Sequence, residues 1–293
     1  MPAWSLGVAL LASAACRGLD RLPWELVPLP PAGVDQSRTV DGPVIHIDRV
    51  RFHSASMGDD RYFLALVPNG PEPVTRIMII NHGWYDRPEY LVEHLAIDRV
   101  YADLLTKNAV ERAIIVLPDL RIVSRFGGNR PRPPRSAVTT YVADDVAGLA
   151  ALRYGIPADR SHWSVSGFSF GGFVALDVGR TSGDRFGGVG VVSGFYDPAW
   201  AFWQTPDRSA GPGGDARSTS LAGPPPRLLL ACGTSDRFFN DMQSLHRRFE
   251  LSGVRHEWLT AAGGHTWKYW ATVVEPLLMF HLGRDEKAGA QPG

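Results

Sequence analysis

Residues 167–171 (Gly-Phe-Ser-Phe-Gly) have the types and spacing most suited to chemistry in this chain. A serine with a glycine two positions away on each side is typical of a nucleophile elbow, a tight strand-to-helix turn that presents a hydroxyl above a sheet edge. Glycine is needed there because a Cβ would collide with the neighbouring strand or helix. The pattern predicts a nucleophile at Ser169. The alternative is a solvated serine in an ordinary turn, since a chain with 31 glycines produces such patterns by chance.

A serine nucleophile needs a general base, and the base should lie on a loop after Ser169. Three of the downstream histidines fall elsewhere: His246 in a helix-like stretch, His256 in the predicted last strand and His281 on the terminal helix. His265 lies in a glycine-rich loop just after that last strand. We therefore predict His265 as the base, the alternative being a loop histidine without a special role.

The base in turn needs a carboxylate that orients it. Asp236 lies on the loop that leaves the predicted strand 227–232, and it precedes His265 by 29 residues. Asp241 is the competing candidate, but the chain has begun a helix there, where a carboxylate suits the helix N-terminus. Asp236 is the predicted acid.

Two backbone N–H groups are expected to hold an oxyanion. One belongs to Phe170, the residue after the nucleophile. The other belongs to the loop after the apolar strand 76–80, where Trp84 is the best candidate and Tyr85 the second. We expect His82, in the same loop, to have a structural role beneath it.

Aromatic residues cluster around these positions in the sequence. Tyr85, Phe168 and Trp267 are predicted to line an apolar substrate pocket, together with Trp84 and Phe170. The alternative for the aromatic residues between 267 and 270 is packing of the last helix against the core, which the spacing favours for Trp270.

Predicted strands and helices alternate along the chain, and they must position these residues. Period-two patterns predict antiparallel strands at 43–50 and 61–67, and apolar runs predict buried strands at 76–80, 113–119, 161–166, 188–193, 227–232 and 256–259. Helices are predicted at 90–107, 140–153, 173–179, 242–251 and 267–282. This order predicts an α/β fold with a mostly parallel central sheet, helices on both faces and an active site at the carboxyl ends of the strands.

Composition narrows the function further. The 293 residues are 44% hydrophobic with a net charge of zero, which gives no electrostatic basis for nucleic-acid binding. Two cysteines, Cys16 and Cys232, form no disulfide framework or metal-ligand spacing. We expect no metal and no cofactor.

The chain is divided by composition into three parts: an irregular or signal-like segment 1–37, a single α/β domain 38–283 and a disordered tail 284–293. Residues 3–15 are apolar and end at Ala-Ala-Cys, which resembles an export signal and is too short to span a bilayer. The protein is therefore either exported or cytoplasmic. The loops 121–135 and 205–226 break the strand–helix pattern.

Five blocks in this order resemble the putative esterase family: His82-Gly83, residues 116–119 (Val-Leu-Pro-Asp), residues 167–172, residues 232–236 (Cys-Gly-Thr-Ser-Asp) and residues 263–270 (Gly-Gly-His-Thr-Trp-Lys-Tyr-Trp). This group includes esterase D, feruloyl, acetyl-xylan and enterochelin-type esterases and mycolyltransferases of the antigen 85 type. The similarity covers roughly residues 43–283. It implies an α/β-hydrolase fold with Ser169, Asp236 and His265 as the triad, and it leaves the two loops unmatched.

The predicted function is a serine hydrolase that cleaves carboxylic esters through an acyl-enzyme, acting on a small-molecule or carbohydrate-linked ester. An acyltransferase on the same scaffold is the first alternative. A serine peptidase and a non-catalytic binding protein are the others. The sequence does not distinguish ester substrates from one another, and it does not fix the oligomeric state.

Overall fold

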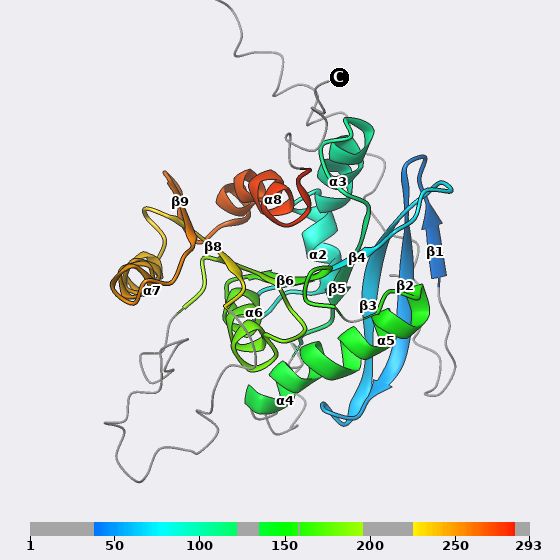
Figure 1. Cartoon of the computed structure of the whole chain (residues 1–293), viewed down its shortest axis with the longest axis horizontal. Coiled ribbons are helices and arrows are strands. Elements are labelled where there is room, and N and C mark those ends of the chain that lie inside the picture. The colour runs from blue at the N-terminus through cyan, green and yellow to red at the C-terminus, as the bar shows by residue number, and fades with distance from the viewer. Residues whose placement is uncertain (1–37, 122–134, 158, 196–224, 285–293) are drawn as a thin grey trace, which may run out of the picture.

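Nine strands of the described residues form one continuous sheet in the order β1-β2-β3-β5-β4-β6-β7-β8-β9 (Figure 1). The computed structural model describes residues 38–121, 135–157, 159–195 and 225–284. The strands are β1 Arg38–Asp41, β2 Ile45–Ser54, β3 Asp59–Pro68, β4 Arg76–Asn81, β5 Ala113–Pro118, β6 Trp163–Phe168, β7 Gly188–Val192, β8 Arg227–Gly233 and β9 Glu257–Ala261. Strands β4 to β9 run parallel, and β1 to β3 add to one side in antiparallel fashion. The predicted mostly parallel sheet is confirmed.

The central strands are apolar on both faces because helices cover both sides. Every residue of β5 is buried, and its side chains alternate between two hydrophobic clusters. Ile114 and Val116 belong to one cluster, whereas Ile115 and Leu117 belong to the other. A continuous apolar run is thus the sequence signature of a strand with no solvent face.

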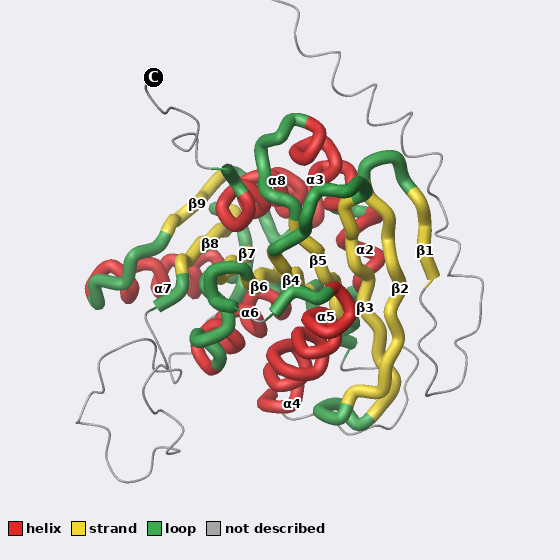
Figure 2. Tube along the Cα trace, turned by 45° about the vertical axis from the view of Figure 1, so that its right-hand side comes forward, coloured by secondary structure: helices red, strands yellow, loops and turns green. Residues whose placement is uncertain are grey.

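Two layers of helices sandwich the sheet (Figures 1 and 2). One face carries α4 Arg135–Thr140, the π-helical segment η2 Tyr141–Val146, α5 Ala147–Tyr154, α6 Phe170–Thr181 and α7 Phe239–Leu251. The other face carries α2 Pro88–Glu93, α3 Ile97–Thr106 and α8 Trp267–Leu282. The bounds of α8 match the predicted 267–282.

One predicted helix is wrong. The stretch 90–107 was expected to be continuous, but it divides into α2 and α3 around Ala96, whose φ is 51°. A left-handed residue cannot continue a right-handed helix, so the chain turns there and starts again. The predicted helix 140–153 begins earlier, at Arg135, and passes through η2.

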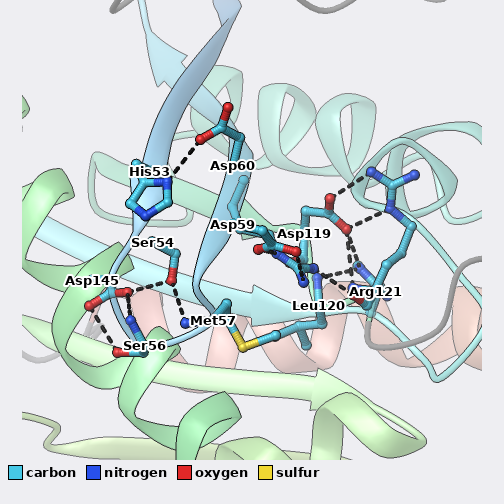
Figure 3. Close-up of polar contacts among 12 residues, drawn as sticks. His53, Ser54, Ser56, Met57, Asp59, Asp60, Asp119, Leu120, Arg121 and Asp145 are labelled. Atoms are coloured by element: carbon cyan, nitrogen blue, oxygen red, sulfur yellow. Dashed lines mark hydrogen bonds and ion pairs between the residues drawn. The ribbon is translucent and has the colours of Figure 1, made fainter. Parts of the chain in front are cut away.

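Polar contacts fix the β2–β3 hairpin to its surroundings (Figure 3). Asp145 in η2 accepts hydrogen bonds from the hydroxyl of Ser54 at 2.5 Å and from the N–H and hydroxyl of Ser56 at 3.0 Å each. On the opposite side, the Arg61 guanidinium donates to the carbonyl of Arg121 at 2.5 Å. The hairpin therefore holds both a helix and the carboxyl end of β5 in place.

The predicted segment 1–37 and the predicted tail 284–293, apart from Arg284, lie outside the described residues, as do most of the loops 121–135 and 205–226. The export signal and the three-part division of the chain therefore stay predictions. In the part of the chain that the structure describes, no helix has the length and apolar character needed to cross a bilayer.

Candidate active site

The turn between β6 and α6 places Ser169 at the carboxyl edge of the sheet. Ser169 has φ 54° and ψ −120°, a conformation that costs a non-glycine residue about 1–3 kcal/mol. Its N–H donates to the carbonyl of Val192 at the end of β7, at 2.8 Å. The strain is thus held by the neighbouring strand, and the side chain is only 7% exposed.

The two glycines of the elbow are required by close approach of backbones. A Cβ on Gly167 would lie 2.2 Å from the carbonyl carbon of Gly171, and a Cβ on Gly171 would lie 2.3 Å from the carbonyl oxygen of Asn81. Both distances are far below van der Waals contact, and backbone atoms cannot swing aside. The collisions predicted from the sequence are therefore found at both positions.

Three of the predicted site residues meet at this edge. The Oγ of Ser169 lies 2.9 Å from Nε2 of His265, and Nδ1 of His265 lies 3.0 and 3.1 Å from the two carboxylate oxygens of Asp236. Asp236 follows β8, and His265 stands between β9 and α8. The competing carboxylate, Asp241, lies in the first turn of α7, as expected.

The charge of Asp236 is set by its surroundings. Burial raises the pKa of its carboxyl, but the hydrogen bond with His265, the Phe238 N–H at 2.9 Å and the nearby Ser193 hydroxyl outweigh it, so the pKa lies below the ordinary value. A carboxylate that is ionised at neutral pH accepts the Nδ1–H of His265. Nε2 of His265 is then the acceptor for the Ser169 hydroxyl.

The two predicted oxyanion donors, Phe170 and Trp84, lie beside the nucleophile. Phe170 is the first residue of α6, where a backbone N–H has no partner within the helix. The loop that holds Trp84 follows β4, and the Trp84 ring meets the Phe170 ring edge-on with centroids 4.6 Å apart. A Cβ on Gly83 would lie 3.6 Å from Cβ of Ser169. The backbone of this loop therefore passes beside the nucleophile.

His82 holds that loop from beneath. Its imidazole is fully buried: Nδ1 donates to the carbonyl of Gly83 at 2.7 Å, and Nε2 accepts the N–H of Leu120 at 2.9 Å. Burial lowers the pKa of His82 to about 4, so the ring is neutral. Because the Gly83 carbonyl is fixed, the plane of the peptide that carries the Trp84 N–H is fixed as well.

A bidentate ion pair supports the end of β5 behind this histidine (Figure 3). Arg121 donates from Nε and Nη2 to the two carboxylate oxygens of Asp119 at 2.7 and 2.6 Å. Asp119 also lies 4.0 Å from Nε2 of His82. Sequence reasoning noted the Val-Leu-Pro-Asp block but missed that its aspartate lies next to His82, beneath the loop that holds Trp84. The apolar strand followed by Asp119 was the signal available.

One pocket prediction is wrong. Phe168 is fully buried and packs against Trp270 in the core, with ring centroids 5.8 Å apart, because it is the last residue of a strand covered on both faces. Tyr85 is 70% exposed and Trp267 is half-buried, so both have accessible surface that a substrate can contact. Trp270 is buried, as the core interpretation predicted, with its ring 4.9 Å from that of His265.

Phe238 was missed by sequence reasoning. Its half-buried ring stands edge-on to the imidazole of His265, with the ring centroids 5.1 Å apart. Its position two residues after Asp236 was the available signal. The described residues hold no group of three or more side chains suited to bind a metal ion.

The sheet order, the strained serine turn and the hydrogen-bonded Ser169, His265 and Asp236 define a protein of the α/β-hydrolase fold. The putative esterase family matches residues 54–277, and the chain belongs to that family. Family and fold together class it among the esterases.

Solved structures of esterases and serine hydrolases share this fold. A ferulic acid esterase from the fungus Anaeromyces mucronatus is 18% identical, with a TM-score of 0.63 over 86% of this chain and 94% of its own. The fluorophosphonate-binding serine hydrolase F of Staphylococcus aureus is 15% identical, with a TM-score of 0.63 over 82% and 99%. An S-formylglutathione hydrolase from Agrobacterium tumefaciens is 15% identical, with a TM-score of 0.62 over 83% and 97%.

Among curated proteins, an uncharacterised protein of Corynebacterium glutamicum is 27% identical over 152 residues. The match spans 46% of this chain and 35% of the length of that protein.

Proposed function

We propose that the protein is a serine carboxylesterase that works through Ser169, His265 and Asp236. The observation that carries the proposal is the 2.9 Å contact between the Ser169 hydroxyl and Nε2 of His265, backed by the Asp236 carboxylate at 3.0 Å. A hydroxyl bonded to an imidazole that a carboxylate orients is the arrangement that nucleophilic acyl transfer requires.

The chemistry takes two steps. Ser169 attacks the ester carbonyl while His265 takes the hydroxyl proton, and the N–H groups of Phe170 and Trp84 donate to the oxyanion. His265 then gives that proton to the leaving alcohol, and an acyl-enzyme results. Water attacks the acyl-enzyme in the same way, with His265 again as base, and the carboxylic acid leaves. Asp236 holds the imidazole tautomer throughout.

The substrate class is a small-molecule or carbohydrate-linked ester. Several of the structures that share the fold are ferulic acid esterases, one of them in complex with ferulic acid. In this chain the half-buried rings of Trp84, Trp267 and Phe238 lie near the elbow and His265. Aromatic rings favour apolar or aromatic groups on the ester.

Replacement of the nucleophile tests the proposal. Ser169→Ala should lower turnover of p-nitrophenyl acetate by about 10⁴- to 10⁶-fold and abolish labelling by a fluorophosphonate probe. Ser244→Ala, which removes an exposed hydroxyl on α7, is the matched control and should retain both. Wild-type rates and labelling in Ser169→Ala would refute the assignment.

A further inference from the structure

A cavity lies at the amino ends of the parallel strands, at the opposite end of the sheet from Ser169. It has a volume of about 440 Å³ and is formed where β4, β6, β7 and β8 begin, next to the last turn of α8. Parallel strands present their amino ends here, so the cavity is remote from the catalytic edge. Its size lies within the range of small-ligand sites.

Three guanidinium groups line this cavity, from Arg76, Arg160 and Arg227. Arg76 forms an ion pair with Glu111 and donates to the carbonyl of Ser161 at 2.8 Å. Its positive charge therefore already has a carboxylate partner.

The other two arginines are held by backbone carbonyls alone. Arg160 donates to the carbonyls of Gly183 and Pro225, the latter at 2.8 Å. Arg227 donates from Nη2 to the carbonyl of Phe280 at 2.7 Å and lies over the Phe280 ring. Neither forms an ion pair with any carboxylate of the described residues. Carbonyl contacts fix a guanidinium in place but leave its charge uncompensated.

Asp159 is the one carboxylate among the described residues that line the cavity, and it contacts neighbouring residues of its own loop. Asp159 accepts the N–H and the hydroxyl of Ser161 at 2.8 Å each, and it lies 3.5 Å from Nδ1 of His162. Within the described residues, Arg160 and Arg227 therefore have no carboxylate partner at this cavity, whereas Arg76 is paired with Glu111. Arg76 and Arg227 line the same cavity, where burial, and then the positive charge of Arg227, lower the pKa of Arg76.

We propose that this cavity is a binding site for a small organic oxyanion, a carboxylate or a phosphate ester, held by Arg160 and Arg227. Within the described residues, Nε and Nη1 of Arg227 form no hydrogen bond, so the N–H groups of both nitrogens are available to the oxygens of an anion. The site is separate from the proposed ester chemistry.

Calorimetric titration of the purified full chain with phenyl phosphate, and separately with benzoate, tests the proposal. Arg227→Gln should weaken binding of the preferred anion by about tenfold or more, and Arg160→Gln should do the same. Arg247→Gln, which neutralises an exposed arginine on α7, should leave the affinity unchanged. Arg227→Lys retains the charge without the fork and should give an intermediate affinity.

The two probes identify the ligand source, since tighter binding of phenyl phosphate indicates a phosphate ester and tighter binding of benzoate a carboxylate. Absence of binding to the wild type, or equal binding to the wild type and to the folded Arg227→Gln and Arg160→Gln variants, would overturn the proposal. Turnover of p-nitrophenyl acetate should stay at the wild-type rate in these variants, which separates this site from the proposed function.

Discussion

Asp236 and Asp241 are chemically identical side chains five residues apart, and their surroundings assign them different tasks. Asp236 is buried and bonded to Nδ1 of His265, whereas Asp241 is half-buried in the first turn of α7. The sequence already distinguishes the two, because Asp236 lies on the loop that directly follows a predicted parallel strand. Such loops lie at the carboxyl ends of the strands, where the active site is expected.

The pair gives a matched test at the residue scale. Asp236→Asn should lower kcat for p-nitrophenyl acetate by about 10²- to 10⁴-fold, because an amide no longer holds the Nδ1–H tautomer. Asp241→Asn should change kcat little. A large loss in Asp241→Asn with little loss in Asp236→Asn would reverse the assignment.

His82 shows where residue-scale prediction stops. A structural role followed from its position after a buried strand, but its acceptor role toward the Leu120 N–H joins residues 38 apart and depends on how β4 and β5 pair. Replacement by Gln tests this role, because a glutamine amide cannot span the Gly83 carbonyl and the Leu120 N–H with the same geometry. We expect His82→Gln to lower kcat about 10- to 100-fold with a smaller change in KM, measured by steady-state kinetics. Unchanged kcat in a folded variant would contradict it.

At the scale of elements, strands were easier to predict than helix breaks. The buried strands are unambiguous because their apolar runs have no polar interruption, as in β4 and β5. The break between α2 and α3 has no such signal, because Ala96 is a good helix former and yet has a left-handed φ of 51°. Local propensity therefore predicted one continuous helix where the chain forms two.

That break gives a stability prediction. Ala96→Gly should raise the free energy of unfolding by about 1 kcal/mol, because glycine adopts a positive φ without the steric cost that alanine bears. Ala102→Gly, within α3, should lower it by about 0.5–1 kcal/mol. Urea unfolding of both variants measures the difference. Destabilisation by Ala96→Gly would show that the left-handed turn carries no strain.

At the scale of the whole molecule, two buried histidines link stability to pH. Burial lowers the pKa of His82 to about 4 and that of His281 to about 3, and His281 hydrogen-bonds Ser166 at 2.8 Å. Between the unfolded pKa of about 6.5 and these values, only the unfolded chain takes up the protons. The contribution of the two neutral histidines to the free energy of unfolding is therefore fully present above about pH 6.5, and it is lost as the pH falls toward 4.

Each buried histidine contributes at most about 1.4 kcal/mol per pH unit to that slope. His281→Gln should remove about half of the slope that the two buried histidines contribute to the free energy of unfolding as a function of pH. Urea unfolding at several pH values from about 4.5 to 6.5 measures this slope. The absolute stability of the variant does not enter, since only the slope is compared. An unchanged slope would show that His281 is protonated in the folded state.

The end of the sheet at β9 has a consequence for how activity is lost. Among the described strands, β9 pairs on one side only, with β8, and all five of its residues are exposed or half-buried. His265 follows this strand by a short loop. Edge strands open at a lower free energy than the interior of a sheet. Amide hydrogen exchange at β9 should therefore be faster than exchange at β6. A low concentration of denaturant should abolish esterase activity before circular dichroism detects any unfolding.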